Sequence, residues 1–108
     1  MEFTPFYIEA IHKINTIKLK AYVLDMGEIN AEDIRYDDCI LTKMINKKIT
    51  ENPENAGVLL QLDYVHKQYH ENAELIIEYK EQNKDKAFKL LDDLKDNSSY
   101  ILEHLAKF

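Results

Sequence analysis

The middle of the chain reads LLQLDYVHKQYHENAELII over residues 59–77, and this stretch decides the fold. Its apolar side chains recur at steps of three and four residues, which is the period of an α-helix with one buried face. The members of this stripe are Leu59, Leu62, His66, Tyr69, His70, Ala73 and Ile77. We predict a long helix over residues 54–82, which Asn52-Pro53 separates from the preceding segment. Both histidines lie on its buried face.

The first predicted helix covers residues 4–26. Thr4 suits the N-cap, Pro5 the first helical position and Gly27 the position just past the C-terminus. Its apolar residues form two stripes on opposite sides. One contains Ile8, Ile11, Leu19, Tyr22, Val23 and Met26 with His12 and Asn15 among them, and the other contains Ile14, Ile17, Ala21 and Leu24. A helix that is apolar on two sides must bury both, so the second stripe predicts contact with another chain, and we expect a homodimer.

Two more helices complete the predicted fold. A polar connection over residues 27–36 leads to a short helix over residues 38–48, which holds Cys39 in its first turn. The last helix covers residues 84–106. Its inner face consists of Ala87, Leu91, Leu94, Ser98, Ile101, Leu102 and Leu105. Four amphipathic segments with short connections predict an all-α fold, an antiparallel four-helix bundle in which the short helix carries the cysteine.

The composition narrows the class of protein. A chain of 108 residues is long enough for one domain, residues 1–108, with its own core. The formal net charge of −6 argues against a nucleic-acid partner, because binding to the phosphate backbone needs a basic face. The one cysteine cannot form an internal disulfide, no stretch resembles a signal peptide, and no apolar run reaches the ~20 residues of a membrane span. We therefore expect a cytoplasmic protein without a membrane partner.

Four side chains on three predicted helices form a candidate metal site. They are His12, Cys39, His66 and His70, which include the only cysteine and three of the four histidines. Three imidazoles and one thiolate make a closed tetrahedral shell for Zn²⁺. A bundle core builds such sites from inward positions on separate helices, and a helix N-terminus favours the thiolate form of Cys39. Four protein ligands leave no position for water, so the zinc ion would be structural or regulatory.

Each of these residues also has a plainer explanation. Histidines on an apolar face can be hydrogen-bonded core residues, and a lone cysteine is often a small buried apolar residue. The remaining histidine, His104, is predicted on the outward side of the last helix, exposed to solvent. Asp63 lies one turn before His66 and is a candidate partner for that ring. The sequence has no glycine-rich phosphate loop, nucleophile elbow or HExxH motif, so we expect no enzyme.

With these residues in place, the sequence resembles the chemoreceptor zinc-binding (CZB) domain family, a small bacterial helix bundle with a three-histidine, one-cysteine zinc site. The family has a histidine in its first long helix, a cysteine that opens a short helix, and His-x-x-x-His in the next long helix. Here these are His12, Cys39 and HKQYH at residues 66–70. The sequence departs from the family where Thr42 replaces a glycine and Met44 replaces a tryptophan.

The resemblance implies regulation by Zn²⁺. In such domains the metal controls an attached or partner signalling protein, such as a chemotaxis receptor or a diguanylate cyclase. Some are proposed to sense oxidants such as hypochlorous acid through the zinc-bound cysteine, because oxidation to a sulfenic acid weakens the sulfur as a ligand. The alternative function is a protein-interaction or dimerisation bundle in which zinc is purely structural or absent.

Overall fold

The computed structural model describes residues 5–105, without the side chains of Pro5, Phe6, Asp33 and Asn55. Its α-helices are α1 (Pro5–Val23), α2 (Ile40–Glu51), α3 (Ala56–Gln82) and α4 (Lys84–Leu105), and its 3-10 helices are η1 (Ala31–Ile34) and η2 (Pro53–Asn55). The described residues contain no strand, so the predicted all-α class is confirmed. The predicted N-cap Thr4 and helix end Ala106 lie outside the described residues.

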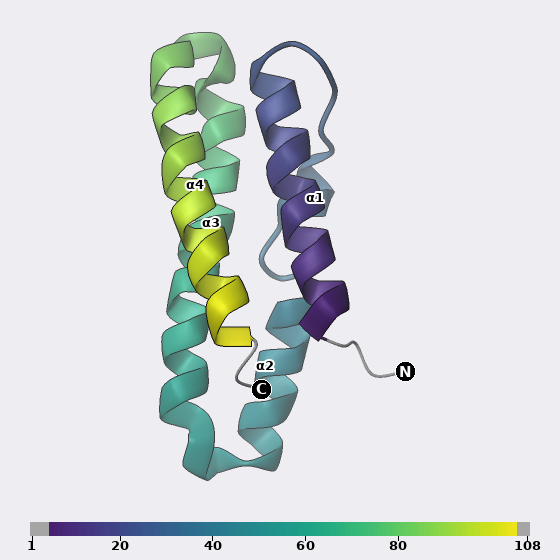
Figure 1. Cartoon of the computed structure of the whole chain (residues 1–108), viewed down its shortest axis with the longest axis vertical. Helices are drawn as coiled ribbons and strands as arrows, with labels where there is room; N and C mark the ends of the chain where they lie inside the picture. The colour runs from purple at the N-terminus through teal and green to yellow at the C-terminus, as the bar shows by residue number, and fades with distance from the viewer. Residues whose placement is uncertain (1–4, 106–108) are drawn as a thin grey trace.

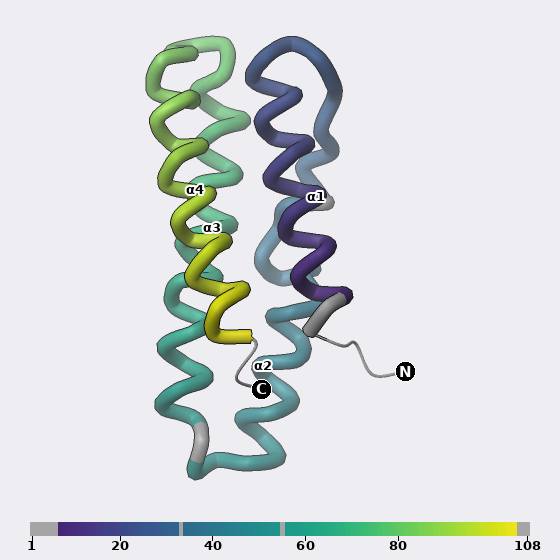
Figure 2. The backbone as a smooth tube through the Cα atoms, viewed as in Figure 1, coloured from purple at the N-terminus to yellow at the C-terminus, as the bar shows by residue number. Residues whose placement is uncertain are grey.

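The helices form an antiparallel bundle that measures 44 × 25 × 21 Å along its principal axes (Figure 1). α3 runs the length of the bundle, and α4 returns beside it. α1 lies beside α4 and the upper part of α3, whereas α2 continues along the lower part of α3, below α1 (Figures 1 and 2). α1 and α2 therefore occupy successive positions along α3. Within the described residues, no helix is long and apolar enough to cross a membrane.

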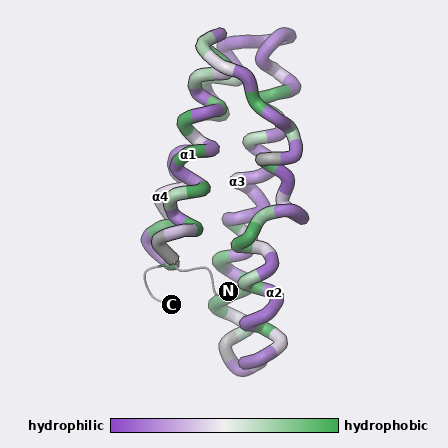
Figure 3. The backbone as a smooth tube through the Cα atoms, turned by 90° about the vertical axis from the view of Figure 1, so that its right-hand side faces the viewer, coloured by the Kyte–Doolittle hydropathy of each residue, from purple (hydrophilic) through white to green (hydrophobic). Residues whose placement is uncertain are grey.

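The core receives side chains from all four α-helices and from η1. Figure 3 shows hydrophobic and hydrophilic residues interspersed along every helix, as amphipathic packing requires. The buried apolar residues are Ile8, Leu19, Val23, Ile34, Leu41, Ile45, Leu59, Leu62, Tyr69, Ala73, Ile76, Ala87, Leu94, Ile101 and Leu105. On α4, the predicted inner face is confirmed, although Leu91 and Leu102 are only partly buried.

The end of α1 differs from the prediction. The helix stops at Val23, and Asp25 takes the left-handed backbone conformation (φ 59°) that was expected at Gly27. The Met26 N–H donates to the Ala21 carbonyl (2.8 Å), which closes a Schellman-type C-cap around Asp25. Because the chain turns away there, Met26 is 78% exposed and does not join the inward stripe.

Ion pairs explain why an aspartate stands at this cap. The Asp25 carboxylate lies 2.8 Å from the Lys80 ammonium and 2.9 Å from the Lys84 ammonium, so one residue joins the end of α1 to the α3–α4 turn. These two lysines lower the pKa of Asp25 to about 2. The sequence rule that favours glycine at a C-cap takes no account of cations on other helices.

The sequence predicted a polar connection between α1 and α2, but the observed connection also contributes an apolar side chain to the core. Within it, η1 brings Ile34 into the core, where its side chain is 1% exposed. The Tyr36 hydroxyl donates a hydrogen bond of 2.6 Å to the Asp63 carboxylate on α3. The connection is therefore fixed to α3 at two points before it reaches Cys39.

Cys39 is the N-cap residue of α2, whereas the sequence predicted it inside the first turn of this helix. Its backbone is extended (φ −74°, ψ 135°), and the helix begins immediately after it. The Thr42 hydroxyl donates to the Tyr36 carbonyl (2.5 Å) and so holds the first turn of α2 against the connection. This contact gives Thr42 a structural role of its own.

Candidate metal centre

All four predicted ligands meet at one place in the core. His12, Cys39, His66 and His70 each contribute one ligand atom, and these four atoms lie within 4.8 Å of one another. α1 supplies His12, the N-cap of α2 supplies Cys39, and the middle of α3 supplies the other two. The three imidazoles are at most 2% exposed, and Cys39 is partly exposed. These four residues could therefore hold a metal ion.

Hydrogen bonds at Nδ1 decide the tautomers of two of these imidazoles. The Nδ1–H of His12 donates to the Ile8 carbonyl (2.8 Å), and the Nδ1–H of His70 donates to the Ile34 carbonyl (2.5 Å). A carbonyl oxygen can only accept, so Nδ1 carries the hydrogen in both neutral rings. Their Nε2 atoms consequently present a lone pair to the centre of the cluster, as metal-binding histidines do.

The third imidazole is oriented by a carboxylate. His66 Nδ1 lies 3.4 Å from Asp63 Oδ1, one helical turn earlier on α3. Asp63 is 6% exposed and accepts the hydrogen bond from Tyr36 through its other oxygen. A carboxylate next to Nδ1 favours the tautomer with the hydrogen on Nδ1, so the Nε2 lone pair of His66 also faces the cluster.

The two histidines of α3 bring their Nε2 atoms close enough to share one cation. His66 Nε2 and His70 Nε2 lie 2.9 Å apart, yet both are acceptors in the tautomers described above. A proton between them is disfavoured, because burial lowers the pKa of His66 to about 2 and that of His70 to about 4. Two lone pairs at this distance repel each other, so either the Nε2–H tautomer of His66 donates to His70 or a cation lies between the two nitrogens. A bound metal ion satisfies both nitrogens at once.

The distances suit a tetrahedral ion. A tetrahedron with bonds of ~2.0–2.3 Å has edges of roughly 3.3–3.8 Å between its ligand atoms. Cys39 Sγ lies 3.6 Å from His12 Nε2, within this range. The 2.9 Å between the His66 and His70 nitrogens is a few tenths of an ångström shorter. Since the four ligand atoms lie within 4.8 Å of one another, coordination needs side-chain movements of up to about 1 Å.

The protonation of Cys39 differs from the expectation based on its helix terminus. Burial raises the pKa of the Cys39 thiol, and the opposing effect of the Leu41 and Thr42 backbone amides is smaller. The side chain also makes no capping hydrogen bond to the helix. The protein on its own therefore favours the thiol, and only a cation beside the sulfur would make the thiolate the stable form.

Two tyrosines near the cluster have roles that the sequence did not indicate. The Tyr69 hydroxyl donates to the His12 carbonyl (3.0 Å), and its ring meets those of His12 and His70 edge-on at centroid distances of 5.2 and 5.3 Å. Tyr36 reaches Asp63 from the connection. In the sequence, Tyr69 stands between two histidines on the apolar stripe, which could have indicated that it contacts the cluster. No local sequence pattern indicates that Tyr36 does so.

His104 lies outside the cluster, as predicted, but it is only partly exposed. Its ring stacks on Tyr100 at a centroid distance of 3.8 Å. His104 therefore serves as a matched control for the other three histidines.

Comparisons of the chain with protein-family models, with curated proteins and with solved structures find no match. The resemblance to the CZB family stays a prediction from the sequence.

Proposed function

We propose that this chain is a zinc-binding regulatory module of the CZB kind. The observation that carries the proposal is the meeting of two imidazole Nε2 atoms at 2.9 Å, beside a third imidazole and a sulfur. Nitrogen and sulfur donors in a tetrahedral arrangement suit Zn²⁺, whereas Mg²⁺ and Ca²⁺ select oxygen ligands. Four protein ligands complete the shell, which supports a structural or sensing role rather than hydrolysis.

The arrangement of the ligands supports a role in signalling. The imidazoles come from the long helices α1 and α3. Cys39 instead lies where the connection meets the short helix α2. Loss of the sulfur as a ligand would remove the tie between the metal and the start of α2, leaving that turn held by the Thr42–Tyr36 hydrogen bond and the three histidines in place. Such a change in one segment is a common form of switching.

Oxidation is one way to remove this ligand. Cys39 is partly exposed, so a small oxidant can reach it. The thiolate would give two electrons to hypochlorous acid and take up its oxygen to become a sulfenic acid, with chloride leaving. We propose that the resulting movement of α2 acts on a signalling protein, of which a chemoreceptor or a diguanylate cyclase is the kind that the CZB resemblance implies.

Native mass spectrometry with and without a chelator tests the metal. We expect one zinc ion per chain, lost with the chelator, and no zinc at the same metal concentration in the Cys39→Ala variant. The His104→Ala variant should keep its zinc, because His104 lies outside the cluster. A metal-free mass for protein that was purified with zinc present would overturn the proposal.

A protein-interaction bundle is the second candidate function. The observation that favours it is the outer stripe of α1, where Ile14 and Ile17 are 50% and 68% exposed. If zinc is only structural, partner binding should not respond to Cys39 oxidation. The two functions are therefore distinguished by a binding assay before and after treatment with hypochlorous acid.

The Asp63 carboxylate should strengthen the site without touching the metal. Replacing it in Asp63→Asn removes the charged acceptor beside His66 Nδ1, which we expect to weaken zinc binding about 10–100-fold. Competition with a chromogenic chelator would measure the change. The matched control is Asp92→Asn, at an exposed position on α4. Equal affinities for the two variants would show that Asp63 does not support the site.

A further inference from the structure

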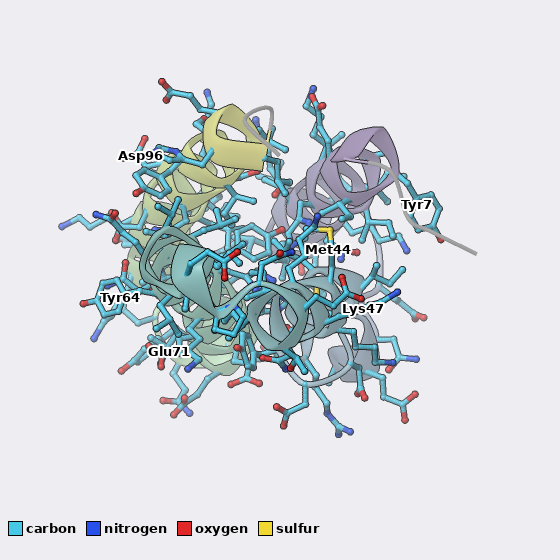
Figure 4. The ribbon with its side chains drawn as sticks, turned by 90° about the horizontal axis from the view of Figure 1, so that it is seen from below. Tyr7, Met44, Lys47, Tyr64, Glu71 and Asp96 are labelled. Carbon is cyan, nitrogen blue, oxygen red and sulfur yellow. The ribbon has the colours of Figure 1, made fainter. Side chains whose placement is uncertain are left out.

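The outer side of α1 has the residue spacing of a coiled-coil seam. Apolar residues follow one another at alternating steps of three and four: Tyr7, Ala10, Ile14, Ile17, Ala21 and Leu24. These are the a and d positions of a heptad repeat. The large members remain accessible, since Tyr7, Ile14, Ile17 and Leu24 are 45%, 50%, 68% and 41% exposed. Figure 4 shows Tyr7 pointing away from the bundle.

Lysines border this seam on both sides. Lys13 and Lys20 occupy g positions, and Lys18 occupies an e position. Lys13 forms an exposed ion pair with Glu9 (2.8 Å), whereas Lys18 and Lys20 form no ion pair in the part of the chain that the structure describes. The borders of the seam are thus basic, although the whole chain has a net charge of −6.

The acidic residue at this end of the seam, Asp25, lies beyond the end of α1 and is already engaged. Asp25 follows Lys18 by seven residues and forms ion pairs with Lys80 and Lys84. It therefore contributes little negative charge to the border of the seam. A partner helix that lies along α1 would meet lysines on both flanks.

A second copy of this chain, the partner that the sequence predicted for this stripe, fits the seam poorly. In a parallel pair, the g residue of one helix faces the e residue five positions later on the other, which sets Lys13 against Lys18. In an antiparallel pair, g faces g and e faces e, which sets Lys13 against Lys20 and Lys18 against itself. Like charges across an interface disfavour association, so both arrangements repel.

We propose that the outer seam of α1 docks an amphipathic helix of a partner protein, with apolar residues at its a and d positions and Glu or Asp at its e and g positions. The seam spans about 26 Å at 1.5 Å per residue, or some two and a half heptads. A contact of this length suits a reversible association. The docking surface lies on the side of α1 opposite His12 and does not require the metal.

A pair of synthetic peptides tests the charge selection. Both contain three heptads with Ile at a and Leu at d; one has Glu at every e and g position, and the other has Lys. Calorimetric titration of the full chain should give 1:1 binding of the Glu peptide. The Lys peptide should bind at least roughly tenfold more weakly, because attraction at three positions becomes repulsion. Equal binding of both peptides, or binding of neither, would overturn the proposal.

Variants of the chain locate the surface. Ile17→Glu should weaken binding of the Glu peptide more than about tenfold, since the seam loses an apolar contact and gains a repelling charge. The matched control is Leu60→Glu, at another exposed apolar position, on α3 (56% exposed). The double variant Lys18→Glu/Lys20→Glu should reverse the preference between the peptides. If sedimentation shows a dimer that Ile17→Glu converts to a monomer, the occupant is a second copy and the proposal is wrong.

Discussion

Lowering the pH from 7 to 5 should remove roughly 4 kcal/mol of folding free energy from the metal-free chain. Burial keeps His66 and His70 neutral in the fold, with pKa values of about 2 and about 4. In the unfolded chain both titrate near 6.5, so below that pH protons bind the unfolded state preferentially. Each histidine then costs about 1.4 kcal/mol per pH unit, or about 2 kcal/mol at pH 5. Burial lowers the pKa of His12 as well, which acts in the same direction.

The sign of this effect identifies its source. A histidine whose pKa is lowered by folding contributes stability that is fully present above pH 6.5 and is lost as the pH falls towards the folded value. Urea denaturation at pH 7, 6 and 5, with a chelator present, measures the loss. His104→Ala should show the same dependence as the natural chain, whereas His66→Leu should lose about half of it. A stability that stays constant from pH 7 to pH 5 would contradict the assignment of neutral buried histidines.

The sequence predicts those parts of the site that a single helix determines. His66 and His70 follow the 3.6-residue period of α3, so their shared buried face follows from their spacing alone. The approach of Cys39 to His12 was only a hypothesis from the sequence, since the two residues are 27 positions apart and the fold brings them together. The structure confirms that the four residues converge, and the metal itself remains a prediction.

The sequence fails where a contact between distant elements decides the local structure. Asp25 replaces the expected glycine at the α1 cap because lysines from α3 and α4 reach it. Ile34 enters the core from a stretch that reads as polar, and its carbonyl then accepts the hydrogen bond from His70. Burial raises the pKa of the Cys39 thiol, an effect that a rule based only on the helix terminus does not include. In each case a partner far along the chain outweighs the local preference.

Zinc should raise the melting temperature of the chain by on the order of 15–20 °C. A ligand that binds only the folded state at about 1,000 times its dissociation constant adds about 4 kcal/mol of stability. For a domain of this size, each kcal/mol shifts the melting temperature by about 4 °C or more. A bound cation would also accept the lone pairs of the His66 and His70 Nε2 atoms, which lie 2.9 Å apart. Scanning calorimetry of the chelated protein, with and without added zinc, measures the shift.

The source of this shift can be assigned to the four ligands with three comparisons. Magnesium should leave the melting temperature unchanged, because the site offers nitrogen and sulfur rather than oxygen donors. Cys39→Ala should lose most of the zinc-dependent shift, while the melting temperature of the metal-free variant stays close to that of the metal-free natural chain, since the side chain is small and partly exposed. Hypochlorous acid added to the zinc-loaded protein should lower the melting temperature towards the metal-free value. Zinc that stabilised Cys39→Ala as strongly as the natural chain would show that the sulfur is not a ligand, and the proposed switch at the start of α2 would then have no basis.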